Sequence, residues 1–103
     1  MFGLKQTHID AIHQCFARYS DIEQVIIYGS RANGRYKNGS DIDITIVGSL
    51  DYNHLLKLEI ELDDLLLPYK IDLSLHRQIN SPDLLDHIQR AGKMFYEKKS
   101  NLT

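Results

Sequence analysis

The chain has 103 residues, of which 43% are hydrophobic, so it supports one small domain with one core and excludes a second independent domain. Twelve basic and fourteen acidic residues leave a net charge of -2, which excludes the overall basic field of proteins that bind nucleic acid nonspecifically. A single cysteine, Cys15, excludes an intrachain disulfide, and no apolar run reaches the length of a membrane span, so we expect a cytoplasmic protein that does not bind a membrane.

The first half of the chain predicts one helix and two strands. Apolar residues recur at helical spacing from about residue 5 to residue 19, with Thr7 as the expected N-cap. A β-branched and aromatic run at residues 25–28 predicts a buried strand that ends at Gly29 and Ser30. After a short helical turn within residues 31–36, a second strand is expected over residues 41–47.

The second half predicts a helix, a strand, a helix and a short edge strand. Residues 51–67 carry the longest helical pattern, with Pro68 as the expected stop. Its leucines exceed what one inward stripe needs, which leaves a partner-binding surface open beside the simpler core role. Residues 70–75 alternate as a half-buried strand, and Ser81 and Pro82 begin a helix that we expect to reach residue 90 or 91. Residues 94–96 predict an edge strand.

This order of elements predicts an α+β or α/β domain with a small sheet that helices cover on one face. The other face would then be polar and open to a ligand. We assign residues 1–97 to the domain and residues 98–103 to a polar tail that we expect to be mobile.

Three aspartates mark the expected site. Asp41 and Asp43 lie two residues apart at the start of a strand, so their side chains should point the same way. Asp72 lies on the polar side of another predicted strand. Three converging carboxylates suit hard divalent cations bound together with phosphates, and two such ions would support displacement at phosphorus. The alternative is that these acids are simply solvated at strand ends.

Gly29 and Ser30 could bring backbone and hydroxyl donors to a triphosphate, although an ordinary tight turn explains the pair equally well. Two common nucleotide fingerprints fail: Ser40 stands where a P-loop needs its lysine, and no G-x-G-x-x-G occurs. Three loop cations, Arg31, Arg35 and Lys37, could neutralise phosphate or be solvated. The five histidines share no metal-ligand spacing, which favours surface or packing roles.

The string Gly29-Ser30, ten residues, then Asp41-x-Asp43 resembles the defining motif of the DNA polymerase β-like nucleotidyltransferases. The fuller Gly-Ser-Arg-Ala-x-Gly-x5-Ser-Asp-Ile-Asp resembles their minimal bacterial branch, the MNT antitoxins that pair with HEPN toxins. The resemblance extends over nearly the whole chain, including Asp72 and the ending Gly-x-x-x-Tyr at Gly92. It implies the polymerase β-like core with a small mixed sheet.

The resemblance also implies residue roles. Asp41, Asp43 and Asp72 would bind two Mg²⁺ ions, with Asp72 helping to deprotonate the acceptor. Gly29 and Ser30 would hold the triphosphate of ATP, with Arg31 and Ser40 as further nucleotide-binding candidates.

By the same resemblance, the protein would be a magnesium-dependent nucleotidyltransferase that moves AMP from ATP to a hydroxyl of a partner HEPN toxin, expected to be a tyrosine hydroxyl, and so acts as an antitoxin. The helical acceptor domain of larger relatives is missing from the printed sequence, so we expect the acceptor on another protein, with no direct contact to nucleic acid. Two alternatives stay open: a non-catalytic antitoxin that acts by contact, and the nucleotide-binding subunit of a two-component small-molecule nucleotidyltransferase.

Overall fold

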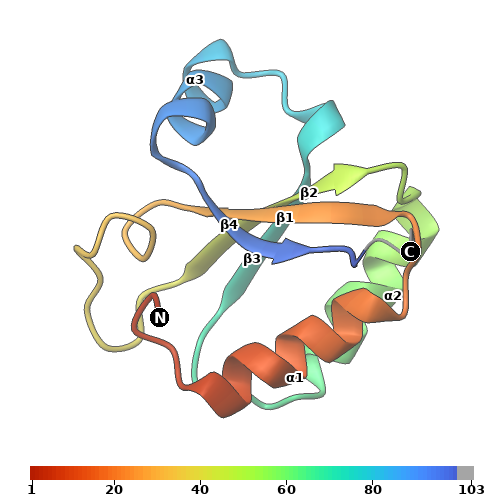
Figure 1. Ribbon diagram of the computed structural model, residues 1–103, viewed down its shortest axis with the longest axis horizontal. Helices are drawn as coiled ribbons and strands as arrows, with labels where there is room; N and C mark the ends of the chain where they lie inside the picture. Colours follow the sequence, from red (N-terminus) through yellow and green to blue (C-terminus); the bar gives the residue numbers. More distant parts are fainter. Residues whose placement is uncertain (100–103) are drawn as a thin grey trace.

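The computed structural model describes residues 1–99, and residues 100–103 lie outside that description. Figure 1 shows the elements in chain order. They are α1 (Gln6–Ala17), β1 (Ile22–Tyr28), β2 (Ile42–Gly48), α2 (Tyr52–Asp63), β3 (Ile71–Leu75), the 3-10 turn η1 (His76–Gln78), α3 (Pro82–Ala91) and β4 (Lys93–Glu97). The predicted fold class, α+β with a small sheet, is confirmed, and so is the edge strand near the C-terminus.

The four strands form one mixed sheet in the order β3-β2-β1-β4. β1 runs antiparallel to both of its neighbours, whereas β2 and β3 are parallel and are joined through α2. A parallel pair needs such a crossover, because a tight turn cannot return the chain to the same end of the sheet. β3 and β4 are therefore the two edges of the sheet.

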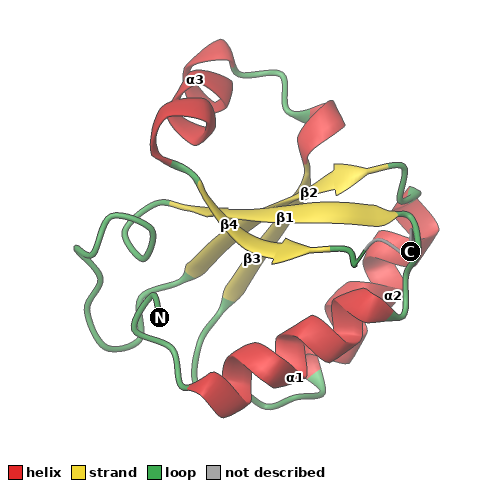
Figure 2. Ribbon diagram, in the orientation of Figure 1, coloured by secondary structure: helices red, strands yellow, loops and turns green. Residues whose placement is uncertain are grey.

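The core lies between one face of the sheet and two helices. α1 and α2 lie together on that face, on the lower side of the sheet in Figure 2. β2 supplies Ile42, Ile44 and Ile46, which are at most 1% exposed, and the helices supply the fully buried Phe16 and Leu58. Alternation along a strand sends every second side chain to one face, so these isoleucines line the core and the residues between them face away.

α3 lies on the opposite side of the sheet, so the expectation that helices cover one face holds only for α1 and α2. On this helix Ile88 is buried, whereas Leu84 and Leu85 are partly exposed. The start of this helix is as predicted: the Ser81 hydroxyl accepts a hydrogen bond from the Leu84 amide, with Pro82 in the first turn. The helix leans on β1 through Ile26, which lies next to Gly92.

Three predicted element boundaries are wrong. Thr7 is not the N-cap of α1, because the helix already begins at Gln6 and Lys5 holds that position. β1 begins at the fully buried Ile22 and not at residue 25, where the predicted strand starts. α2 ends at Asp63, well before Pro68, because the chain tightens into a turn and Leu66 adopts the left-handed conformation with φ 53°.

The C-terminal segment is tied to the sheet at its start. The Lys98 amide donates to the Glu23 carbonyl over 2.9 Å, and the Lys98 ammonium donates to the Ser20 carbonyl over 3.0 Å. The rest of the predicted mobile tail, residues 100–103, lies outside the described residues. The boundary between domain and tail stays a prediction. None of the helices within residues 1–99 is long and apolar enough to cross a membrane.

Candidate active site

A row of three polar side chains crosses the sheet on the face away from α1 and α2. Tyr28 of β1 pairs with Asp43 of β2, and Asp43 pairs in turn with Asp72 of β3. Directly paired residues of neighbouring strands share one face, so the phenol and the two carboxylates lie side by side. Asp41 precedes Asp43 by two residues and lies just before β2 begins. The structure therefore brings together the three aspartates singled out in the sequence.

The proximity of these groups shifts their pKa values. Burial raises the pKa of Asp43 above its usual value, and the negative charges of Asp72 and Asp41 raise it further. The pKa of Tyr28 is also raised, again chiefly by burial, with Asp43 and Asp72 adding to the shift against the opposing effect of Ser74. Like charges held close together favour the protonated form. A cation placed at this row would relieve the repulsion.

Gly29 allows the chain to turn tightly beside Asp43. Its φ is +76°, in the left-handed region that favours glycine. A Cβ atom at this position would lie 2.5 Å from Asp43 Oδ2, so the missing side chain leaves the space that the carboxylate occupies. The turn is closed by hydrogen bonds from the Ala32 amide to the Gly29 carbonyl and from the Arg35 amide to the Ser30 carbonyl. Ser30 is thereby held next to the aspartate row.

Arg31 is buried in the loop, with 2% of its surface exposed. Its Nε donates to the Ser40 carbonyl over 3.0 Å, and one terminal nitrogen donates to the Phe2 carbonyl over 3.1 Å. The guanidinium lies over the rings of Tyr36 and Tyr69, 5.3 and 4.7 Å from their centres. These contacts join the N-terminal segment, the loop between β1 and β2, and Tyr69 just before β3. As placed, Arg31 holds the loop together, and its role in nucleotide binding stays a prediction.

Ser40 also has a local role in the loop. Its hydroxyl accepts a hydrogen bond from the Lys37 amide over 2.8 Å, while its carbonyl accepts from Arg31. These bonds order the chain directly before Asp41. Arg35 and Lys37, by contrast, are exposed, so they are the loop cations that an anionic ligand can reach.

The residues fit a magnesium site in their chemistry. Carboxylate oxygens are the ligands that Mg²⁺ prefers, and Asp41 and Asp72 are exposed while Asp43 is half-buried. Within residues 1–99, however, no three acidic, histidine or cysteine side chains are arranged to hold one ion together. The strands thus bring the three carboxylates to one patch without bringing them around one point, as mutual repulsion would favour.

The sequence did not single out Tyr28 or His87 for this face. The ring of His87, on α3, packs edge-on against the ring of Tyr28 at 6.4 Å between centres. Tyr28 could have been suspected only if its pairing with Asp43 were known, and His87 only if α3 were placed above the polar face. His8, His13 and His54 each pack against an aromatic ring, which agrees with their expected packing roles.

Comparisons with known proteins identify similar sequences and folds. The family model described as polymerase beta, nucleotidyltransferase matches residues 10–101. A protein of Methanocaldococcus jannaschii named putative protein adenylyltransferase is 46% identical over 37 residues. That match covers 36% of this chain and 37% of the relative, so the chain is matched to well under half of that protein's length.

Solved structures share the fold. A chain from a toxin-antitoxin complex crystallised with AMP-PNP is 22% identical, with a TM-score of 0.69 over 93% of this chain and 76% of that chain. A chain from a complex of the tri-AMPylated HEPN toxin of Shewanella oneidensis with its MNT antitoxin is 20% identical, with a TM-score of 0.66 over 92% of this chain and 74% of that one.

Proposed function

Because this chain belongs to the polymerase beta nucleotidyltransferase family, we propose that it transfers AMP from ATP to a hydroxyl of a partner HEPN-type protein and so acts as its antitoxin. The acceptor would be a tyrosine, and the reaction would take place in the cytoplasm. The observation that carries the proposal is the in-register pair Asp43 and Asp72 beside the Gly29 turn. That arrangement places a compact group of carboxylates next to a backbone turn that an ATP phosphate can approach closely.

Each proposed role follows from position. Asp41, Asp43 and Asp72 would hold Mg²⁺, which supplies positive charge to the triphosphate and to the acceptor oxygen when bound. Gly29 and Ser30 would face the phosphates, because Gly29 lacks the side chain that would block a close approach. The exposed Arg35 and Lys37 would neutralise further phosphate charge.

The proposed reaction is a displacement at the α-phosphorus of ATP. The acceptor hydroxyl oxygen forms the new bond to phosphorus, the bond to the bridging oxygen breaks, and pyrophosphate leaves. Asp72 is exposed at an edge strand, where it can take the proton that the hydroxyl loses.

A partner protein as the acceptor is supported by the solved complexes. One similar structure is described as a tri-AMPylated HEPN toxin in complex with an MNT antitoxin, and another as a toxin-antitoxin pair with AMP-PNP. Those descriptions concern the proteins in those crystals, which share only the fold with this chain. They make a HEPN-type protein encoded beside this chain the first acceptor to test.

The test uses ATP labelled on the α-phosphate, Mg²⁺, this protein and the HEPN-type product of the neighbouring gene. We expect label on the partner, loss of label with the Asp41→Ala/Asp43→Ala variant, and loss again when the acceptor tyrosine is changed to Phe. Equal labelling by the double variant, or no label on the partner, would contradict the proposal.

The two alternatives predict different results. If the protein acts by contact alone, the double aspartate variant will still protect cells fully from the partner. If it serves a small-molecule transferase, pyrophosphate release will depend on a hydroxylated small molecule and a separate helical subunit, with no label on protein. Measuring protection and pyrophosphate release with the same variant separates the three functions.

A further inference from the structure

An apolar patch on α2 and the loop after it has no role in the fold. Within residues 1–99, seven large apolar side chains are exposed, and four of them belong to this region: Tyr52, Leu56, Ile60 and Leu66. We call these four the α2 patch. The inward leucines of the same helix, such as Leu58 and Leu62, are buried in the core. The helix is thus apolar on two sides, of which the fold uses one.

The three helical residues of the patch lie in one row along α2. Tyr52, Leu56 and Ile60 are spaced four residues apart, so they lie above one another on the helix surface, with 59%, 39% and 61% of their surfaces exposed. Contiguous exposed apolar residues with polar neighbours are typical of protein-protein contact sites, whereas single exposed residues are not.

Leu66 adds an independent observation. It is 88% exposed, and its φ of +53° is a left-handed conformation that is unfavourable for leucine. Neither the backbone strain nor the exposure of this side chain is compensated by packing within the fold. A partner that covers Leu66 would bury this side chain and so remove its apolar surface from water.

Negative charge surrounds the patch. Glu59 and Asp63 lie on α2 beside the apolar side chains of the patch, and Asp64 follows at the helix end. Lys57 is the basic residue of the helix. Charge complementarity therefore favours a partner segment with apolar side chains flanked by lysine or arginine.

A groove leads from this helix to the proposed active site. It has a volume of about 310 Å³ and is lined by Glu59 and Asp63 of α2, by Tyr69 and Lys70, and by the open edge of β3 including Asp72. A chain lying on α2 can continue along β3 without crossing the core. Its lining includes Asp72, the residue that we propose takes the acceptor proton.

We propose that the α2 patch and this groove are the docking surface for a basic, partly apolar segment of the acceptor protein, which delivers its hydroxyl to Asp72. This inference rests on the proposed function, because it assigns the acceptor side of the same site. The segment would cover the four apolar side chains of the patch, pair its cations with Glu59 and Asp63, and follow the edge of β3.

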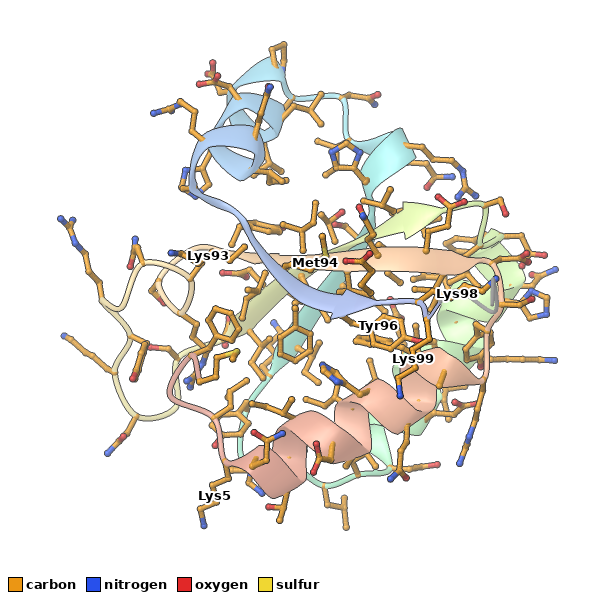
Figure 3. The ribbon with its side chains drawn as sticks, in the orientation of Figure 1. Lys5, Lys93, Met94, Tyr96, Lys98 and Lys99 are labelled. Atoms are coloured by element: carbon orange, nitrogen blue, oxygen red, sulfur yellow. The ribbon has the colours of Figure 1, made fainter. Side chains whose placement is uncertain are left out.

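The opposite edge of the sheet differs in charge and provides a control. β4 and the residues after it carry Lys93, Lys98 and Lys99, which lie along the front of the molecule with Met94 in Figure 3. Its pairing with β1 is interrupted by a bulge, and charged residues and bulges are the usual protection of an edge against added strands. Met94 is 46% exposed, similar to Leu56, but it lies on the edge opposite the proposed docking surface. It therefore serves as the control position.

The experiment measures binding of the purified HEPN-type product of the neighbouring gene by calorimetry, in the Asp41→Ala/Asp43→Ala background so that no transfer occurs. In this background we expect Leu56→Asp/Ile60→Asp to raise the Kd at least tenfold and Glu59→Lys/Asp63→Lys to raise it several-fold. We expect Met94→Asp to leave the Kd within twofold. In the active protein, Leu56→Asp/Ile60→Asp should raise KM for the partner while binding of ATP alone is retained.

The outcomes separate this inference from the proposed function. If the partner binds but is never labelled, the proposed transfer fails while the docking surface is still tested by Kd. An unchanged Kd for Leu56→Asp/Ile60→Asp, an equal loss with Met94→Asp, or no binding of the partner to the unmodified chain overturns the docking surface. Circular dichroism and the milder Leu56→Ser/Ile60→Ser variant show that a weakened Kd does not arise from unfolding.

Discussion

The two faces of β2 separate stability from chemistry. On one face Ile42, Ile44 and Ile46 are sealed under α1 and α2, and on the other Asp43 stands between two further carboxylates. The buried face gains free energy from every apolar contact, whereas the polar face holds charges whose mutual repulsion opposes folding. The comparison shows that one seven-residue strand can carry the core and the site at once, since its two sets of side chains do not meet.

Asp43→Asn should have the largest effect on activity, and it should change activity and stability in opposite directions. We expect transfer of AMP to fall by a factor on the order of 10³ or more, because an amide cannot replace a carboxylate in a magnesium site. We expect the melting temperature in EDTA to rise by a few degrees, because the neutral amide removes a repelled and partly buried charge. Transfer assays and thermal melts of the same preparation measure both. A lower melting temperature would contradict the assigned repulsion.

The pH dependence of unfolding gives the same contrast another readout. The pKa of Asp43 is raised in the folded state, so the folded protein holds this proton more tightly than the unfolded chain does. Its contribution to stability is therefore present below the unfolded value of 3.8 and is lost as pH rises through the raised value. Asp43→Asn should remove this loss when unfolding by urea is compared across that range.

Ile44→Ala, one residue away on the other face, should do the opposite. The side chain is fully buried, and shortening it leaves a cavity, so we expect unfolding free energy to fall by about 2–4 kcal/mol. Under conditions where the variant is folded, KM for ATP should change little. Urea titration and steady-state kinetics test the two parts. A large change in KM without a loss of stability would contradict the view that the two faces of β2 serve stability and chemistry separately.

Arg31→Met tests whether the buried arginine holds the loop or binds phosphate. Two backbone carbonyls, of Ser40 and Phe2, would lose their donors, so we expect a loss of about 2 kcal/mol in unfolding free energy. Arg31→Lys should recover only part of it, since an ammonium cannot reach both carbonyls. If stability is unchanged while KM for ATP rises tenfold, Arg31 binds phosphate instead.

Gly29→Ala should have the smallest effect on stability. The left-handed backbone disfavours alanine by about 1 kcal/mol, and the added methyl group displaces the Asp43 carboxylate. Because that carboxylate is in the proposed site, we expect kcat to fall about tenfold, more than the loss of stability explains. Chemical denaturation and single-turnover transfer distinguish the two. An unchanged kcat would contradict the proposed role of the Asp43 carboxylate beside this turn.

The local elements could be predicted because they depend on short-range patterns. The alternating isoleucines of β2, the Ser81-Pro82 helix start and the Gly29 turn are each decided by neighbours within a few residues. The end of α2 was misplaced because Pro68 is a visible stop signal, whereas the left-handed Leu66 that precedes it is not.

The sequence by itself determined the fold class, the alternation that directs Asp41 and Asp43 to one face, and the motif that indicates the family. Only the tertiary structure decided that Asp72 lies in register beside Asp43, that Arg31 is buried in the loop, and that α3 packs against β1 on the polar side of the sheet. Strand pairing and helix placement depend on contacts between segments far apart in the chain. Spacing along the sequence carries no information on which distant residues become neighbours, so these features appear only once the core has formed.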